Sequence, residues 1–320
     1  MLQKVEVNNY QTLAGKEVRS VQLSYEIFGQ ELHTAPIVLV NHALTGNSSV
    51  IGERGWWNGL IGENKCIDLN HYTVLGFNIP GNGYDGVEEN LLVDHTLLNA
   101  GDIARIFAAG LEALGVKKLY AAIGGSIGGG IAWELAALYP KMIKHLIPIA
   151  TDWKSTDWLK ANCLVQQQIL NNSKNPVYDA RLHAMLIYRT PQSFSQKFNR
   201  TYNDDKDMFN VESWLLHHGD KLNQRFSLSA YKALNYMLAN IDITRNGKSF
   251  TEVASAIQSE IHIVSVNSDI FFTADEDQRT FEALKKIKKN VTYGIIDSIH
   301  GHDAFLIEFE QLTELLKNVF

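Results

Sequence analysis

A serine set among glycines is the feature of the sequence best suited to chemistry. Residues 119–123 form a short apolar run, Gly124-Gly125-Ser126-Ile127-Gly128 fits the pattern G-x-S-x-G, and helical periodicity follows. This order predicts a strand, a tight turn and a helix, with Ser126 raised as a nucleophile above the end of a parallel sheet. A phosphate-binding turn is the alternative, but Ser126 stands where the dinucleotide motif needs its middle glycine.

A serine hydroxyl needs a histidine as base, and that histidine needs a carboxylate to orient it. In the hydrolase-type arrangement these follow in the order serine, acid, histidine. Asp269 comes just after a predicted strand at residues 260–266, and the loop after the last predicted strand offers His300 and His302. Position alone favours His302 but leaves both histidines open.

Two other segments bear on the same chemistry. The loop at residues 42–48 follows a predicted buried strand, so the backbone N–H groups of Leu44 and Ile127 would hold the negative charge of a tetrahedral intermediate. His42 is interpreted as a structural residue that holds this loop in place. Asp275 and Asp277 are interpreted as charges that complement the dipole of the helix they begin.

Composition excludes several other classes of function. The chain has 320 residues, 45% of them hydrophobic, which is enough for a large globular core. A net charge of −6 gives no basic surface for nucleic acid, and two cysteines cannot form a disulfide framework. Without a signal peptide or an apolar run of about 20 residues, we expect a soluble cytoplasmic protein.

No metal site is predicted, because no cluster of histidines and acids has ligand spacing on one helix face. The histidines outside the candidate site are interpreted as surface or hydrogen-bonded polar residues: His33, His71, His95, His145, His183, His217, His218 and His262.

The arrangement of strand-like and helix-like segments predicts an α/β fold with a mostly parallel central sheet. Residues 4–8 and 20–28 alternate apolar and polar and predict antiparallel edge strands, whereas the later apolar runs predict buried parallel strands. These runs are residues 36–41, 72–78, 117–123, 144–150, 260–266 and 291–296, with helices predicted at 94–114, 275–289 and 304–319. Residues 79–86 match G-x-G-x-x-G formally but predict a loop, because a poor helix start follows.

Strand patterns vanish between residues 151 and 245, where helical segments take over. We therefore expect a core formed by residues 1–150 and 246–320, and a helical lid formed by residues 151–245.

Several longer motifs resemble the homoserine O-acetyltransferase family, which has the α/β-hydrolase fold. They are His42-Ala-Leu-Thr-Gly46, Gly55-Trp-Trp-Asn-Gly-Leu-Ile-Gly62, Gly124-Gly-Ser-Ile-Gly-Gly129, Val211-Glu-Ser-Trp-Leu215, His218-Gly-Asp-Lys221, Arg225-Phe226 and Gly301-His-Asp-Ala-Phe-Leu306. These motifs occur in the family's order and span nearly the whole chain.

The resemblance implies transfer of an acetyl group from acetyl-CoA to the hydroxyl of homoserine through an acyl-serine intermediate, with ping-pong kinetics. It implies Ser126 as nucleophile, Asp269 as acid and His302 as base. Arg181, Tyr188 and Asp303 match the residues that bind the amino acid. It further implies acetyl-CoA as co-substrate, no bound cofactor, and a homodimer formed through the lid.

The sequence also departs from the family pattern. The loop at residues 79–86 differs, the segment from Leu170 to Arg181 is shorter, and the run Cys163–Gln167 lacks an arginine. These changes leave open a succinyl donor, serine as acceptor, or hydrolysis by an esterase or thioesterase on the same triad. A non-catalytic binding protein is the weakest alternative, because all three triad residue types are present.

Overall fold

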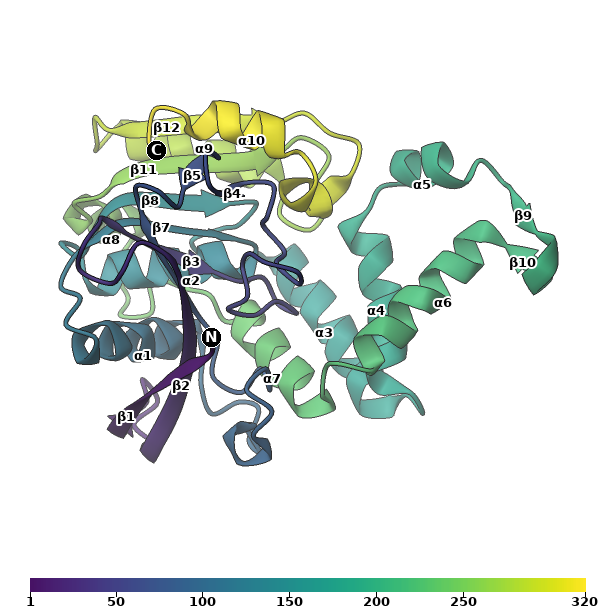
Figure 1. Cartoon of the computed structure of the whole chain (residues 1–320), viewed down its shortest axis with the longest axis horizontal. Helices are drawn as coiled ribbons and strands as arrows, with labels where there is room; N and C mark the ends of the chain where they lie inside the picture. The colour runs from purple at the N-terminus through teal and green to yellow at the C-terminus, as the bar shows by residue number, and fades with distance from the viewer.

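The computed structural model describes residues 1–320, which fold around one eight-stranded sheet (Figure 1). Its strand order is β1-β2-β6-β3-β7-β8-β11-β12. The strands are β1 (Gln3–Gln11), β2 (Glu17–Gly29), β3 (Ile37–Asn41), β6 (Thr73–Phe77), β7 (Leu119–Gly125), β8 (Ile143–Ile149), β11 (Glu260–Val266) and β12 (Val291–Ile296).

The six strands from β6 to β12 run parallel, as the apolar runs predict. Every residue of β3 and β6 is buried, because helices cover both faces of a parallel sheet. The first two strands pair antiparallel, as predicted, but only β1 lies at an edge. The prediction that both are edge strands is wrong for β2, since it also pairs with β6.

Helices cover the two faces of the sheet and create two apolar cores. The larger core includes α1 (Ala100–Ala113) and α2 (Ile127–Leu138), and the smaller one includes α10 (Phe309–Leu316) on the opposite face. The helix predicted at residues 94–114 begins only at Ala100. Asn99 caps the amino-terminal end of the helix. Its side chain accepts a hydrogen bond from the N–H of Asp102, and the Asp102 carboxylate accepts one from the N–H of Asn99.

Two later helices also differ from their predicted lengths. The helix predicted at 275–289 is α9 (Ala274–Lys285), and the one predicted at 304–319 is divided into a 3₁₀ turn, η3 (Gly301–Leu306), and α10. The division falls at Ile307 and Glu308, and the Glu308 carboxylate accepts a hydrogen bond from Ser298. The tight turn η3 carries His302 and Asp303.

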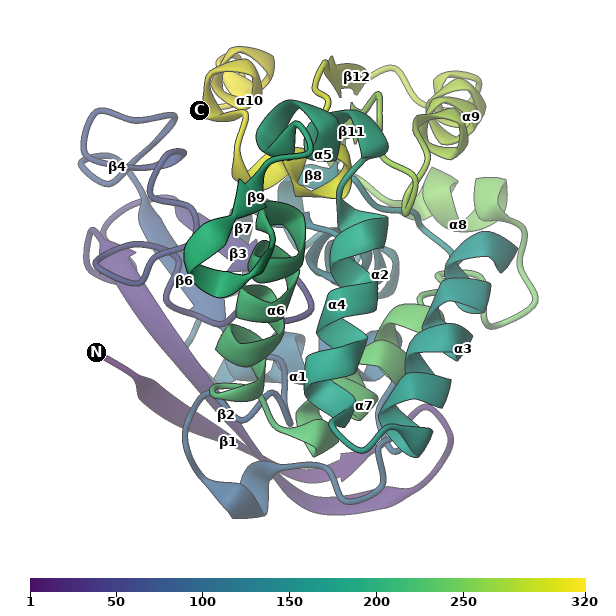
Figure 2. The same cartoon turned by 90° about the vertical axis from the view of Figure 1, so that its right-hand side faces the viewer.

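The segment between β8 and β11 is mainly helical, as its sequence predicts. It contains α3 (Asp157–Asn172), α4 (Pro176–Tyr188), α5 (Pro191–Phe198), α6 (Asn210–Asn223), α7 (Leu228–Ala239) and α8 (Phe250–Ala256). A short hairpin interrupts this helical segment, which the sequence did not predict. It pairs two strands of two residues each, β9 (Tyr202–Asn203) and β10 (Met208–Phe209). Helices α4 to α6 project beyond the sheet in Figure 1, and α4 and α6 lie side by side in Figure 2.

The remaining elements are short: β4 (Ile61–Gly62), β5 (Ile67–Asp68), η1 (Glu88–Asn90) and η2 (Asp204–Lys206). Residues 79–86 form a loop, as predicted. None of the helices combines the length and the apolar composition needed to cross a membrane.

Candidate active site

Ser126 occupies the sharp turn between β7 and α2. Its backbone angles are φ 59° and ψ −133°, a conformation that costs a non-glycine residue about 1–3 kcal/mol. The N–H of Ser126 donates to the carbonyl of Ile149 at the end of β8 (3.0 Å), and the Ser126 carbonyl accepts from Gly129 (3.0 Å). These bonds hold the turn in its strained form at the carboxyl end of the sheet.

Gly124 and Gly128 allow this turn to form because they lack a side chain. A β-carbon at Gly124 would lie 2.5 Å from the backbone of Gly128, and one at Gly128 would lie 2.4 Å from the carbonyl oxygen of Asn41. Both contacts involve backbone atoms, so neighbouring side chains cannot relieve them. The glycines of the motif thus bring the start of α2 against the ends of β7 and β3.

His302 and Asp269 form a buried pair. Asp269 lies just beyond β11, and one of its carboxylate oxygens is 2.6 Å from Nδ1 of His302. The other oxygen accepts from the backbone N–H groups of Phe271 (2.7 Å) and Phe272 (3.0 Å). Because the carboxylate can only accept, Nδ1 carries the proton and Nε2 is left as a base.

Aromatic rings surround His302. The rings of Phe271, Phe272, Phe305 and Tyr188 have their centroids 5.2–5.5 Å from its imidazole. Phe305 also packs against Gly125, where an added β-carbon would lie 2.4 Å from its ring. His302 and the Ser126 turn therefore flank the same phenyl ring, although no direct hydrogen bond joins Ser126 to His302.

His300, the competing histidine, makes a different set of contacts. Its Nδ1 lies 3.0 Å from the guanidinium of Arg189 and 3.0 Å from the hydroxyl of Ser193. Arginine only donates, so this nitrogen of His300 accepts and cannot also donate to a carboxylate. Of the two histidines, His302 alone has a carboxylate oxygen within hydrogen-bond distance of its Nδ1.

The two backbone groups predicted to hold an oxyanion lie at the same edge of the sheet. Ile127 is the first residue of α2, so its N–H has no partner inside the helix. Leu44 is buried and lines a small cavity together with Tyr188 and Phe271. His42 donates from Nδ1 to the carbonyl of Ala43 (2.7 Å) and accepts at Nε2 from the N–H of Ile79 (3.0 Å).

These two bonds agree with the structural interpretation of His42. Burial lowers its pKa to about 4, so the imidazole is neutral at physiological pH, as one donor and one acceptor require.

The three residues predicted to bind an amino acid come from α4 and η3. The guanidinium of Arg181 lies 5.9 Å from the ring centroid of Tyr188, whose ring packs on His302. Asp303 follows His302 directly. Burial raises the pKa of Asp303, and the positive charges of Arg181 and Arg189 oppose that rise. Arg181 forms no ion pair with any carboxylate of the chain within 4.0 Å.

Two arginines near the site were not predicted as site residues, although Arg225 belongs to one of the motifs that resemble the family. Arg189, at the end of α4, lies 3.8 Å from the carboxylate of Asp303, and its place directly after Tyr188 was the available signal. Arg225, between α6 and α7, donates to the backbone carbonyl of Thr45 (2.9 Å) in the loop that carries Leu44. Burial and the charge of Arg181 lower the pKa of Arg225, so two unpaired cations lie within electrostatic reach of each other.

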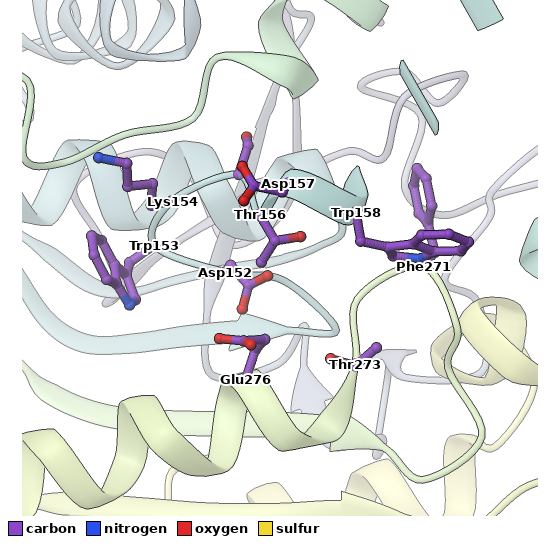
Figure 3. A pocket seen from close by; sticks show the side chains of 10 residues that line it. Asp152, Trp153, Lys154, Thr156, Asp157, Trp158, Phe271, Thr273 and Glu276 are labelled. Atoms are coloured by element: carbon purple, nitrogen blue, oxygen red, sulfur yellow. The ribbon is translucent and has the colours of Figure 1, made fainter. Parts of the chain in front are cut away.

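A larger pocket of about 460 Å³ lies beside this site but contains none of the predicted residues (Figure 3). In Figure 3, the carboxyl groups of Asp152 and Glu276 face each other near the centre, with Trp153 and Lys154 on one side and Trp158 and Phe271 on the other. The pocket is lined by Asp152, Trp153, Lys154, Ser155, Thr156, Asp157, Trp158, Phe271, Thr273 and Glu276. Three carboxyl groups against one lysine make it a poor site for a polyanion.

Asp152, which lines this pocket, and Asp277 are two buried carboxyl groups that the sequence did not single out for burial. Asp275 and Asp277 lie in the first turn of α9, as predicted, but Asp277 is buried and accepts from the hydroxyl of Ser265 (2.7 Å). Burial raises the pKa of Asp277, which argues against its interpretation as a charge that complements the helix dipole. Burial, followed by the charges of Glu276 and Asp269, raises the pKa of Asp152 from 3.8 to about 8. We therefore expect Asp152 to be largely protonated at neutral pH.

Replacing Asp152 by asparagine should change the pH dependence of stability. The folded protein keeps the Asp152 proton to a higher pH than the unfolded chain does. The stability that this proton contributes is therefore lost as pH rises from about 4 to about 8. The unfolding free energy of the unaltered protein, minus that of Asp152→Asn, should fall over this range by at most about 1.4 kcal/mol per pH unit. Chemical denaturation at several pH values measures this difference, and a constant difference would contradict the assignment.

Comparison with known proteins supports the same reading of the fold. Residues 36–176 match the family model described as the alpha/beta hydrolase fold. The chain is 32% identical to a homoserine O-acetyltransferase from Trichormus variabilis, covering 95% of this chain and 89% of that protein. It is also 32% identical to one from Methanococcus vannielii, covering 95% of this chain and 69% of the relative.

Solved structures of other proteins show the same fold. The homoserine O-acetyltransferase from Bacillus anthracis superposes with a TM-score of 0.88 at 18% identity, over 100% of this chain and 97% of that one. Esterase E22 superposes with a TM-score of 0.86, also at 18% identity, over the full length of both chains. At that identity these likenesses show the fold alone. The sequence relatives show more: the chain belongs to the homoserine O-acetyltransferase family, a family of acyltransferases with the α/β-hydrolase fold.

Proposed function

We propose that this enzyme transfers an acetyl group from acetyl-CoA to the hydroxyl of homoserine, with Ser126, Asp269 and His302 as its triad. The observation that carries the proposal is the buried 2.6 Å contact between Asp269 and Nδ1 of His302, beside the strained Ser126 turn. That contact leaves Nε2 of His302 free to remove a proton.

In the first half-reaction, Nε2 of His302 takes the proton of Ser126 as the hydroxyl oxygen attacks the thioester carbonyl. The N–H groups of Leu44 and Ile127 hold the resulting oxyanion, and each such donor typically lowers the barrier by about 3 kcal/mol. When the intermediate collapses, the carbon–sulfur bond breaks and His302 returns the proton to the departing CoA thiolate. Acetyl-Ser126 and free CoA result.

In the second half-reaction, the side-chain hydroxyl of homoserine gives its proton to His302 and attacks acetyl-Ser126. Collapse of this intermediate breaks the bond to Ser126, which regains its proton from His302. The product is O-acetylhomoserine, and release of CoA before homoserine reacts gives ping-pong kinetics.

Recognition of an amino acid requires a cation for its carboxylate and an anion for its ammonium group. Arg181 is free of carboxylate partners and lies over Tyr188, which itself contacts the base. Asp303, adjacent to His302, supplies the negative charge. Because a guanidinium binds a carboxylate through two hydrogen bonds, this trio would fix the hydroxyl of the amino acid in one orientation.

Residues 151–245 act in this proposal as a lid around a core formed by residues 1–150 and 246–320. A lid limits the access of water to acetyl-Ser126 and so favours transfer over hydrolysis. Its helices and the short hairpin β9–β10 also carry exposed apolar side chains, which support a homodimer through the lid: Leu164, Val165, Leu186, Tyr202 and Phe209. Light scattering of the unaltered protein and of Leu186→Asp tests this, and a monomer in both cases would contradict it.

A screen of donors and acceptors tests the proposed reaction. The enzyme is given acetyl-CoA or succinyl-CoA with homoserine, serine or no acceptor, while thiol release and products are measured. We expect rapid CoA release with acetyl-CoA and homoserine, and O-acetylhomoserine as product. Thiol release that does not depend on any amino acid would instead identify a hydrolase, and preference for succinyl-CoA would identify a succinyltransferase.

Replacing Arg181 by alanine should separate the two half-reactions. Loss of a charge-assisted contact of about 1.5–3 kcal/mol should raise KM for homoserine roughly 10- to 150-fold. The rate of Ser126 acetylation by acetyl-CoA should stay within about twofold, as measured by the burst of CoA release. Arg200→Ala, an exposed arginine of the same lid, is the matched control. Equal loss in both half-reactions would show that Arg181 does not bind the acceptor.

A further inference from the structure

A cluster of two histidines and one glutamate lies on the sheet, away from the candidate active site. His145 is in β8, and Glu260 and His262 are in β11. Glu260 is the register partner of His145 on the neighbouring strand, and side chains two residues apart on a strand point to the same face. The sheet therefore places all three side chains together on one face.

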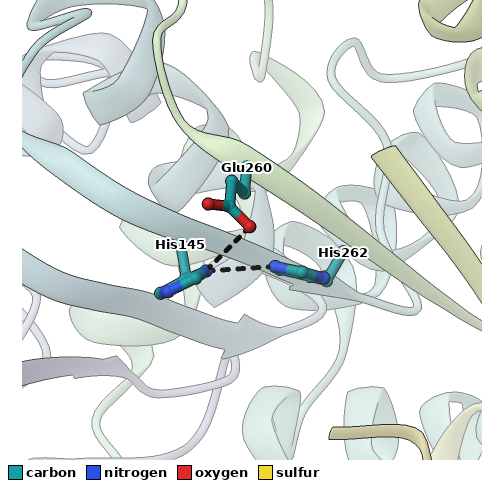
Figure 4. Close-up of side chains that lie close together, drawn as sticks. All are labelled: His145, Glu260 and His262. Carbon is teal, nitrogen blue, oxygen red and sulfur yellow. Dashed lines mark hydrogen bonds and ion pairs between the residues drawn. The ribbon is translucent and has the colours of Figure 1, made fainter. Parts of the chain in front are cut away.

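The donor atoms of these residues lie close together (Figure 4). Nδ1 of His145 lies 3.2 Å from Nε2 of His262 and 3.8 Å from a carboxylate oxygen of Glu260, and all three donor atoms lie within 4.8 Å of one another. A tetrahedral ion with bonds of about 2.0–2.1 Å separates its ligand atoms by about 3.3–3.4 Å. The contact of 3.8 Å is too long for a hydrogen bond but close to this separation.

Neighbouring residues hold both imidazoles in this arrangement. Nδ1 of His262 lies 2.9 Å from the hydroxyl of Thr292, its register partner in β12. When Nδ1–H donates to this hydroxyl, Nε2 presents its lone pair to the centre of the cluster, as a metal-binding histidine requires. The ring of His145 packs against Tyr120 at a centroid distance of 4.9 Å, and the Tyr120 hydroxyl donates to the carbonyl of Val319.

The cluster is accessible from solvent and remote from the triad. The side chain of Glu260 is 42% exposed, whereas that of His145 is 8% exposed, so a water molecule can reach the open side of the cluster. Glu260 begins β11 and Asp269 follows its end, which separates the two sites by about 20 Å along a seven-residue strand. The prediction of no metal site considered ligand spacing along one helix, whereas these three side chains come from two neighbouring strands.

We propose that His145, Glu260 and His262 bind one divalent transition-metal ion, with water as a fourth ligand. Two imidazoles and one carboxylate suit Zn²⁺ and its neighbours in the first transition row rather than Mg²⁺ or Ca²⁺, which prefer oxygen ligands alone. The ion would join β8 to β11 at the amino-terminal ends of the strands, where it serves stability rather than acyl transfer.

Zinc binding by the full-length protein tests this proposal. The protein is first dialysed against a chelator and then titrated with Zn²⁺ in competition with a chromophoric chelator. We expect one ion per chain and a rise in Tm on zinc addition. Glu260→Gln and His262→Ala should each bind zinc at least about 100-fold more weakly, and Thr292→Val about 10- to 100-fold more weakly.

His71→Ala is the matched control, because His71 is exposed and contacts only one carboxylate, that of Asp68. Its zinc affinity should be unchanged. Glu260→Gln alters an exposed side chain, so it remains informative if His262→Ala fails to fold, and Co²⁺ absorption bands then report the ligand geometry. No stoichiometric binding, or equal affinity in the unaltered protein and Glu260→Gln, would overturn the proposal.

Discussion

Replacing Ser126 by alanine is expected to lower the rate of acyl transfer by at least about 10⁴-fold, because the hydroxyl forms the covalent bond to the acyl group. Intact-protein mass spectrometry after mixing with acetyl-CoA should show an acetylated chain for the unaltered enzyme and none for Ser126→Ala. Alanine keeps the β-carbon of serine, so the strained turn should survive and the variant should fold normally.

Ser255→Ala is a suitable control, since Ser255 is an exposed serine of α8 whose hydroxyl bonds only its own helix. It should be acetylated as fully as the unaltered protein. If Ser126→Ala still became acetylated at one site and kept its transfer rate, another residue would be the nucleophile and the proposed mechanism would be wrong.

Replacing Asp269 by asparagine is expected to reduce kcat by about 10⁴-fold with little change in fold. The amide keeps the shape of the carboxyl group and can still accept from the N–H groups of Phe271 and Phe272. Its NH₂ group, however, favours the His302 tautomer with the proton on Nε2, which cannot act as base. Steady-state kinetics with acetyl-CoA and homoserine measure the effect.

Asp277→Asn is the matched control for that substitution. Asp277 is another buried carboxyl group, burial raises its pKa well above the usual range, and its side chain accepts from Ser265 rather than contacting His302. It should keep most of its activity. Equal losses in both variants would indicate that any change to a buried carboxyl group, rather than loss of the contact with His302, lowers the rate.

The positions of Ser126 and Asp269 could be predicted from the sequence because both depend on local signals. A buried strand ending in glycines places a serine at the sheet edge, and a strand followed by a short polar loop places an acid there. The choice between His300 and His302 could not be made from position, because it depends on the winding of η3 and on contacts of His300 with Arg189, which follows α4, and with Ser193 of α5.

The other missed features also depend on pairs of residues that the fold brings together. Arg189 lies close to Asp303, and Arg225 bonds Thr45, only because residues far apart in the sequence pack together in the fold. The edge position of β2 was misjudged because alternation of polar and apolar residues reports one solvent-facing side of a strand, not the absence of a neighbouring strand.

The hydrogen bond from Arg225 to the carbonyl of Thr45 joins residues 151–245, which we propose to act as a lid, to the loop that carries Leu44. In the proposed mechanism, any outward movement of the α6–α7 connection would pull on the residue next to an oxyanion donor. Entry of bulk water and loss of the oxyanion site would then occur in the same movement. The open enzyme would then admit water but lack the oxyanion site that hydrolysis of the acyl group needs. The closed enzyme would have the oxyanion site but admit little water.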